Sequence, residues 1–321
     1  MSCGTFRYLF GPIASRRFGR SLGVDLLGRR ICSFDCVFCE AGPTQTCTFV
    51  RDAFTPVALV ISELRAWFGA GGEADVVTLA GRGEPTLHTG FGAVIDAIHG
   101  MSALPVVLLS NGSLLWMPEV RAAAARADIV KISLSGWDDA SLAAVNQPAA
   151  GVTFDAYLAG MIAFRKQFRG ELRLEVMFLA GFNDTREAAG KIARLAALLA
   201  PDKVELNTVV RPPADSRVLP VADDKLAAFV PLFGSRAVVI GRCVAARAPA
   251  VPVAAEQDPG PQILALLARR GCTLAEIALA VDLSQAVTAG YLQRMVAAGV
   301  VVRTGADPGY YQVGAGVREQ M

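Results

Sequence analysis

The chain has 321 residues, of which 53% are hydrophobic and 19% are charged, a composition typical of a globular protein with about two domains. Its 31 Lys and Arg residues nearly balance 29 Asp and Glu residues, so bulk charge does not indicate a nucleic-acid or membrane-surface binder. Residues 1–20 lack the apolar core of a secretory signal, and seven clustered cysteines are more typical of reduced thiols than of a disulfide framework. We therefore expect a cytoplasmic protein without a membrane span.

Short apolar, β-branched runs alternate with amphipathic helical patterns through most of the chain. Strands are expected at 21–27, 74–80, 105–110, 128–135, 171–180 and 202–208, and helices at 56–68, 91–100, 118–127, 153–168 and 185–200. Such repeated units imply an α/β fold with a parallel sheet covered by helices. Six units suit a partial (β/α)6 barrel of the TIM type, and an open doubly wound sheet is the alternative. In both, the chemistry belongs at the carboxyl ends of the strands.

The alternation ends near residue 208. A Pro-rich segment follows, then a helix expected at 222–233 and a strand at 237–241. Residues 242–260 are rich in Ala and Pro without periodicity, which is typical of an interdomain linker. The expected organisation is a first domain over 1–241, a linker over 242–260 and a small second domain over 261–315.

The second domain combines three helical patterns with a β-hairpin pattern. Thr273 and Ser284 stand at N-cap positions of the second and third helices. This order matches a winged helix-turn-helix. The recognition helix expected at 284–298 holds one basic residue, Arg294, although phosphate neutralisation dominates nucleic-acid affinity. We therefore expect this domain to dock a protein or a substrate in preference to DNA.

Three cysteines lie within eight positions in ICSFDCVFCEAG, residues 31–42. Cys32, Cys36 and Cys39 have the spacing C-x3-C-x2-C. A zinc site would need a fourth ligand such as Cys47, and a redox C-x-x-C pair leaves Cys32 unexplained. A [4Fe–4S] cluster can take three thiolates from one short loop and leave one iron open. The neighbouring motifs favour the cluster.

The cysteine pattern after the first strand, with Phe38 before the last cysteine, resembles the signature of the radical S-adenosylmethionine (SAM) superfamily. TLAGRGEPTLH, residues 78–88, resembles the Gly–Glu motif of that family. Segments similar to those that follow its third, fourth and sixth strands are SNGSLL (110–115), KISLSG (131–136) and LNTVVRPPA (206–214).

The resemblance covers about residues 8–215. Within the superfamily, GPIASRRFGRSLGVDLL and FNDT (182–185) are more similar to the tRNA wyosine synthases and related iron–sulfur oxidoreductases. Wyosine synthases carry a second cluster on additional upstream cysteines. Only Cys3 lies upstream here, so a second cluster of that kind is not expected. The other cysteines outside the motif are Cys47, Cys243 and Cys272.

The resemblance implies that Cys32, Cys36 and Cys39 bind three irons of a [4Fe–4S] cluster and that SAM binds the fourth. It further implies reductive cleavage of SAM to a 5′-deoxyadenosyl radical, with electrons from an external donor of the flavodoxin or ferredoxin type. A modified tRNA base is the substrate suggested by analogy, with a peptide or a small metabolite as alternatives. The alternative function is a DNA-binding regulator that senses a metal or an iron–sulfur cluster.

Residues after successive strands are candidates for holding SAM. They are Phe38, Gly81, Gly83, Glu84, Ser110, Asn111, Ser133, Asn207 and Val209. Glycines let the backbone approach a ligand closely, and the Glu84 carboxylate is suited to the methionine ammonium. For Ser110, Asn111 and Ser133, turn capping is the alternative role.

Arg16, Arg17 and Arg20 form a basic cluster before the first strand. Arginine suits contact with phosphate or carboxylate, so the cluster indicates either an anionic substrate or a solvated charged face. Arg82 stands in the Gly–Glu motif, where it either contacts substrate or faces solvent. His88 either approaches the site or caps a helix.

Overall fold

The computed structural model describes residues 6–240, 258–305 and 309–318. Most of the expected linker, residues 242–257, lies outside the described residues, as do Cys3 and Cys243.

An eight-stranded sheet of strand order β1-β2-β5-β6-β7-β8-β9-β10 forms the centre of the first part of the chain. The strands are β1 (Leu9–Ser15), β2 (Gly19–Val24), β5 (Val76–Leu79), β6 (Val106–Leu109), β7 (Ile129–Ser133), β8 (Glu171–Phe178), β9 (Lys203–Thr208) and β10 (Ala237–Val239). Neighbours from β2 to β10 are parallel, and β1 is antiparallel to β2. The six strands expected from the alternating pattern and the later strand at 237–241 are thus confirmed.

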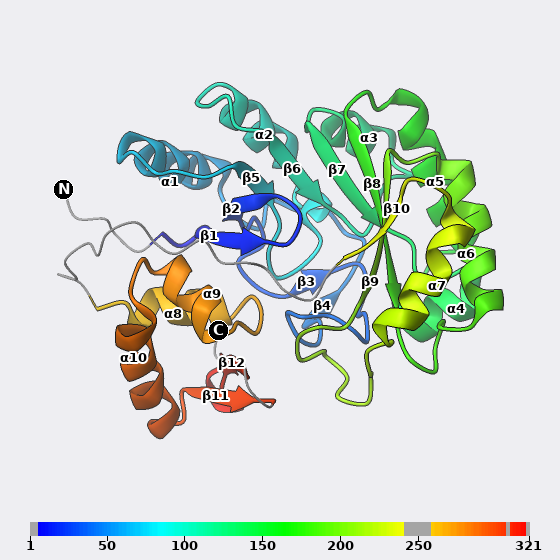
Figure 1. Cartoon of the computed structure of the whole chain (residues 1–321). Helices are drawn as coiled ribbons and strands as arrows, with labels where there is room; N and C mark the ends of the chain where they lie inside the picture. Colours follow the sequence, from blue (N-terminus) through cyan, green and yellow to red (C-terminus); the bar gives the residue numbers. More distant parts are fainter. Residues whose placement is uncertain (1–5, 241–257, 306–308, 319–321) are drawn as a thin grey trace.

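Helices follow most of these strands and cover the sheet from its outer side (Figure 1). They are α1 (Val57–Gly69), α2 (Phe91–His99), α3 (Pro118–Ala124), α4 (Asp139–Val145), α5 (Phe154–Gln167), α6 (Arg186–Leu199) and α7 (Asp223–Phe233), with a 3-10 turn, η1, at Pro85–Leu87. Their apolar faces are buried against the strands in one continuous core. A parallel sheet is stable when both of its faces are covered, and these helices cover the outer face with apolar side chains.

Three structural features were not predicted from the sequence patterns. Strand β1 contains Gly11 and Pro12, and its register with β2 shifts between Phe10 and Ile13. Proline is tolerated on such an edge strand or bulge, so the break in the pattern did not end the strand. Helix α4 is too short for its periodicity to be read, although Asp138 caps it in a capping box. The third is a two-residue ladder that joins β3 (Ile31–Cys32) to β4 (Thr46–Cys47).

The C-terminal unit, residues 258–318, has the expected three helices and hairpin. They are α8 (Gly260–Leu267), α9 (Leu274–Ala280), α10 (Gln285–Ala297), β11 (Val301–Thr304) and β12 (Tyr310–Val313), followed by a short α11 (Ala315–Arg318). Thr273 and Ser284 are the N-caps of α9 and α10, as expected. The unit has an apolar cluster of its own, and α8 and α9 pack against β1. No helix in the described part of the chain is long and apolar enough to cross a membrane.

Two glycines inside helices test the packing of the helical layer. A Cβ at Gly160 of α5 would lie 2.5 Å from the Trp116 backbone nitrogen, whereas at Gly190 of α6 the nearest atom would be the Arg194 Nη1, 3.8 Å away. We expect Gly190→Ala to raise the free energy of unfolding by about 0.5–1 kcal/mol, because alanine loses less backbone entropy. Gly160→Ala should lower it by about 1–3 kcal/mol through overpacking. Chemical denaturation measures both, and equal responses would contradict the described contact of α5.

Candidate active site

A cavity of about 330 Å³ opens at the carboxyl ends of the parallel strands. Its wall includes Gly81 after β5, Leu109 at the end of β6, Met177 on β8 and Asn207 on β9. Cys39 from the cysteine loop also lines it. Loops that are far apart in the sequence therefore meet around one hollow, as the architecture of parallel α/β sheets dictates.

The three cysteines of the motif are free thiols on one short loop. Cys32 ends β3, and the Cys39 N–H donates to the Cys36 carbonyl at 3.0 Å. Two amide side chains point at the sulfur atoms. Asn146 Nδ2 lies 3.3 Å from the Cys36 Sγ, and Asn111 Nδ2 lies 3.6 Å from the Cys32 Sγ. Such N–H donors stabilise negative charge on sulfur, which a metal-bound thiolate carries.

Burial raises the pKa of all three thiols. The rise is large for Cys32, where the neighbouring Glu84 carboxylate adds to it, and for Cys36, where Cys39 adds to it. Burial also raises the pKa of Cys39. The thiols are therefore protonated near neutral pH without a metal, and metal binding would release their protons.

The donor set fits a cluster better than a single metal ion. No group of three or more His, Cys, Asp or Glu side chains among the described residues is arranged to hold one metal ion. In a cubane cluster each thiolate binds a different iron, so its ligands need not converge on one point. Cys47, the fourth ligand that a zinc site would require, is exposed on β4.

Glu84 is buried, with 2% of its surface exposed, and accepts hydrogen bonds from two loops. Its Oε1 accepts from the Ser110 hydroxyl at 2.8 Å and from the N–H and hydroxyl of Thr86 at 3.1 and 2.5 Å. Its Oε2 accepts from the Asn111 N–H at 2.7 Å. Burial raises the pKa of Glu84 despite these bonds. The carboxylate thereby joins the loops after β5 and β6 and holds Asn111 beside Cys32.

The two glycines of the Gly–Glu motif make room for protein atoms. A Cβ at Gly83 would overlap the Ile31 carbonyl oxygen, and one at Gly81 would lie 2.6 Å from the Asp25 Cγ. The Glu84 N–H donates to the same Ile31 carbonyl at 3.2 Å. The motif thus packs directly on the strand that begins the cysteine loop, and Gly81 additionally lines the cavity.

Asn207, Phe38 and Val209 lie at or near the cavity. Asn207 is buried; its Nδ2 donates to Glu175 at 3.1 Å and its Oδ1 accepts from Arg16 at 3.4 Å. Phe38 lines the cavity and packs on the apolar cluster that contains Val209. Val209 is buried there and is not among the residues that line the described cavity.

Other sequence candidates have structural partners. Ser133 ends β7, and its carbonyl accepts from the Tyr157 hydroxyl. Arg82 donates to Asp25 at 3.2 Å and is largely buried, so it does not extend freely into solvent. His88 is buried, with its Nε2 2.7 Å from the Thr55 carbonyl, and it accepts from the Gly90 N–H just before α2.

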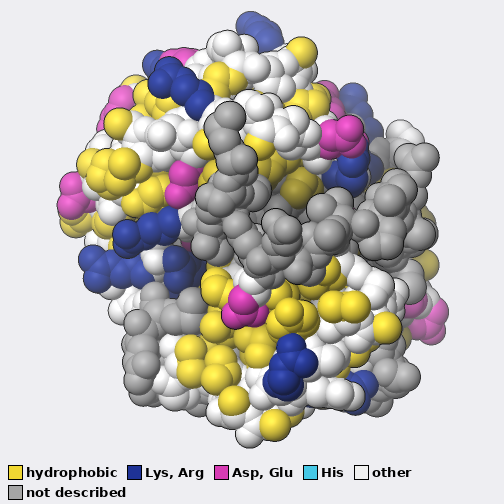
Figure 2. All heavy atoms as spheres, turned by 90° about the vertical axis from the view of Figure 1, so that its left-hand side faces the viewer, with side chains coloured by type: hydrophobic (Ala, Val, Ile, Leu, Met, Phe, Trp, Pro, Cys, Tyr) yellow, Lys and Arg dark blue, Asp and Glu magenta, His cyan; other side chains and the backbone are white. Residues whose placement is uncertain are grey.

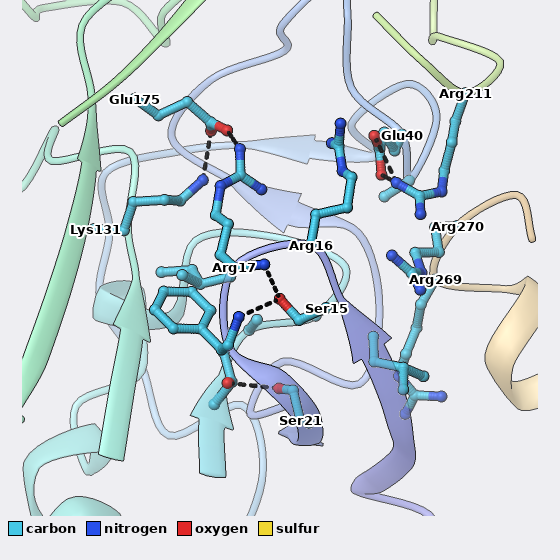
Figure 3. A pocket seen from close by; sticks show the side chains of 18 of the residues that line it. Ser15, Arg16, Arg17, Ser21, Glu40, Lys131, Glu175, Arg211, Arg269 and Arg270 are labelled. Carbon is cyan, nitrogen blue, oxygen red and sulfur yellow. Dashed lines mark hydrogen bonds and ion pairs between the residues drawn. The ribbon is translucent and has the colours of Figure 1, made fainter. Parts of the chain in front are cut away.

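Charged side chains on the inner strands were not expected from the sequence. Lys131 of β7 and Glu175 of β8 form an ion pair that faces the cavity, and Arg17 pairs with the same Glu175 (Figure 3). Arg17 also pairs with Glu205. Burial opposes ionisation of Glu175, but Lys131 and Arg17 together lower its pKa to about 2. The signal in the sequence was a charged residue within each strand, flanked by apolar residues on both sides.

A second ion-pair chain ties the cysteine loop to the C-terminal unit. Arg211 donates to Glu40 at 3.1 Å and to Glu276 at 2.5 Å. Arg270 reaches the same Glu276 at 3.4 Å. Glu40 follows Cys39 directly in the sequence, and this position next to a cysteine of the motif could have marked it as a site residue. Of the three arginines in the basic cluster, Arg20 lies on β2 and pairs with Glu73 at 3.2 Å, outside the cavity.

Residues 28–196, just over half of the chain, match the family model described as the radical SAM superfamily. The chain belongs to the radical SAM superfamily. Members of this superfamily use a [4Fe–4S] cluster and SAM, and they need an electron donor and a substrate.

Relatives of this radical SAM protein include two proteins named UPF0026. One from Synechocystis sp. is 36% identical over 65% of this chain and 77% of its own length. One from Methanocaldococcus jannaschii is 31% identical over 73% of this chain and 72% of its own length. A GTPase Obg of Brachyspira hyodysenteriae is 32% identical over 68% of this chain, which spans only 32% of that protein.

A solved structure shares the fold of this radical SAM protein. It is a radical SAM methyltransferase from Sphaerobacter thermophilus, with a TM-score of 0.52 and 19% sequence identity. The match covers 68% of this chain and 65% of that one.

Single Cys→Ala substitutions test the ligand set. We expect Cys32→Ala, Cys36→Ala or Cys39→Ala each to lose most of the bound iron and sulfide after anaerobic reconstitution, because a cluster that loses one of three protein ligands is held weakly. Cys47→Ala and Cys272→Ala are the matched controls, since Cys47 is exposed and Cys272 is buried in the separate C-terminal cluster. Iron and acid-labile sulfide assays provide the measurement. Full iron retention in the first three variants would contradict the assignment.

Proposed function

We propose that this protein is a radical SAM enzyme of oxidoreductase or transferase type, with Cys32, Cys36 and Cys39 as the ligands of its cluster. The observation that carries the proposal is a loop with three free thiols, of which Cys39 lines the cavity formed by the carboxyl ends of the strands. When bound, the cluster supplies the electron for cleavage of SAM to methionine and a 5′-deoxyadenosyl radical that acts on the substrate.

The chain itself supplies orientation and protection. Asn111 and Asn146 donate to sulfur atoms, which favours the thiolate form of Cys32 and Cys36. The buried Glu84 carboxylate is suited to the cationic amino group of SAM, because a nearby positive charge offsets the cost of burying an anion. In this proposal the residues that hold SAM are Phe38, Gly81, Gly83, Glu84, Ser110, Asn111, Ser133, Asn207 and Val209.

In the same proposal the sheet is a partial (β/α)6 barrel of the TIM type, and residues 261–315 are a winged-helix domain joined through a linker at 242–260. The strand order β2-β5-β6-β7-β8-β9, with each neighbour parallel, supports the barrel. The succession α8, α9, α10 and the β11–β12 hairpin supports the winged helix.

The electron donor is proposed to be of the flavodoxin or ferredoxin type, and the compartment the cytoplasm. The free state of all five cysteines among the described residues is compatible with that reducing compartment. The relation to wyosine synthases, and with it a tRNA base as substrate, stays a prediction from sequence motifs.

The regulator hypothesis finds little support in the C-terminal unit. Arg294 is the single basic residue of α10, and its guanidinium lies over the Tyr291 ring at 4.4 Å. Val287 and Val296 are exposed on the same helix. A helix of this character neutralises few phosphates.

Substitution of Glu84 separates cofactor cleavage from cluster assembly. We expect Glu84→Ala to lower the yield of 5′-deoxyadenosine at least about tenfold, because the SAM amino group loses its anionic partner and Asn111 loses an anchor. Iron content should stay near that of the unchanged protein, since Glu84 is not a ligand. Glu187→Ala on the exposed face of α6 is the matched control. Chromatography of 5′-deoxyadenosine and methionine after anaerobic reduction gives the measurement. A cluster-loaded protein that yields no 5′-deoxyadenosine would refute the proposed function.

A further inference from the structure

The cavity wall carries more positive than negative side chains, and they come from four separate parts of the chain. The cations are Arg16 and Arg17 from the β1–β2 turn, Lys131 from β7, Arg211 after β9, and Arg269 and Arg270 after α8. The carboxylates among the lining residues are Glu40 and Glu175. Figure 3 shows Lys131 and Glu175 on one side of the cavity, Arg211, Arg269 and Arg270 on the other, and Arg16 between them.

Arg16 and Arg269 differ electrostatically from their neighbours. Burial and the adjacent positive charge of Arg17 lower the pKa of Arg16, and Glu40 does not offset them. Burial also lowers the pKa of Arg269, although Asp25 opposes the shift. Arginine stays protonated regardless, so these two positive charges are held in surroundings that favour an added anion.

Two guanidinium groups at this wall retain an unsatisfied donor. Arg211 and Arg269 are 7% and 6% exposed. The Nε atoms of Arg211 and Arg270 are buried and have no hydrogen-bond partner among the described residues, whereas the Arg269 Nε lies 3.3 Å from the Asp25 carboxylate. A buried donor without a partner is costly. Contacts between a ligand and the other nitrogens of the same guanidinium compensate for the cost of the unpartnered Nε. The planar fork of a guanidinium suits the oxygens of a phosphate.

The arginines of this wall lie inside a cavity and are withdrawn from the open surface. Arg211 and Arg269 are buried, and the other lining arginines are half-buried. In Figure 2, which shows the left-hand side of Figure 1, Lys and Arg side chains lie in small separate groups with hydrophobic side chains between them, and no continuous basic stripe crosses the part that is drawn in colour. A small anion that enters the cavity matches this distribution better than a nucleic-acid backbone, which needs extended phosphate contacts.

We propose that this wall binds the phosphate group of a small phosphorylated substrate, and that Arg16 and Arg270 contact it. The proposal deepens the radical SAM function above and rests on it. It gives the C-terminal unit a direct role, because Arg269 and Arg270 of that unit complete the substrate cavity. The ion pair of Glu276 with Arg211 holds this part of the unit against the cavity, and Glu276 also pairs with Arg270 inside the unit.

The test uses the cluster-loaded full chain with SAM present and inorganic pyrophosphate as the probe. Isothermal titration should give saturable binding, with affinity lowered about tenfold or more in Arg16→Gln and Arg270→Gln, because each loses a charge-assisted contact. The matched controls are Arg20→Gln, on β2 close to that turn but outside the cavity, and Arg294→Gln, in the same unit on α10. Both controls should bind the probe as the unchanged protein does. Thermal unfolding of every variant verifies that the fold persists.

Each result decides the proposal. Absence of saturable pyrophosphate binding, or equal affinities in all four variants, overturns it. Tighter binding of unfractionated tRNA than of pyrophosphate, lost in Arg16→Gln and Arg270→Gln, also overturns it, because the cavity then receives RNA. The same samples are assayed for 5′-deoxyadenosine. Cleavage without pyrophosphate binding defeats only this inference, whereas pyrophosphate binding without cleavage defeats the proposed function and leaves the anion site standing.

Discussion

The buried carboxylate of Glu84 is the contact on which the arrangement of the site depends. It accepts from Thr86 in its own loop and from Ser110 and Asn111 in the loop after the next strand. Asn111 in turn donates to the Cys32 sulfur. A charge taken out of water needs several good hydrogen bonds, and these donors become available together only when both loops are in place. The cysteine loop, the Gly–Glu motif and the loop after β6 are thereby fixed relative to one another.

The cavity beyond Glu84 follows from the parallel sheet. Carboxyl ends of neighbouring strands lie side by side, so residues separated by more than a hundred positions share one wall. Lys131 and Glu175 illustrate the consequence, because each is a buried charged residue on one of two neighbouring strands. Buried charges of this kind remain ionised only when they are paired. The register of β7 with β8 sets Lys131 opposite Arg173, two residues before Glu175, so that the Lys131 ammonium reaches the Glu175 carboxylate. The paired charges then form part of a surface that is ready for a charged ligand.

The contacts of the C-terminal unit indicate a role at the cavity. Its pattern predicts a winged helix-turn-helix that docks a protein or a substrate in preference to DNA. In the structure α8 and α9 pack on the edge strand β1, and Arg270 lines the cavity. The link from Glu40 through Arg211 to Glu276 connects this unit to the residue next to Cys39. Substrate binding and the cluster loop are thus physically contiguous, which gives the proposed enzyme a route to couple them.

The sequence by itself determined the alternation of strands and helices, the spacing of Cys32, Cys36 and Cys39, and the helix caps Thr273 and Ser284, because these depend on local propensity and short spacing. It also indicated Glu84 as a site residue through a local motif. Only the tertiary structure decided that Gly83 makes room for Ile31 and that Arg269 and Arg270 face the same hollow as Arg16. Such meetings depend on strand order and on the docking of one unit on another. No local pattern carries that information, because the contacts join residues up to about 250 positions apart, and the burial that gives them strength exists only in the folded chain.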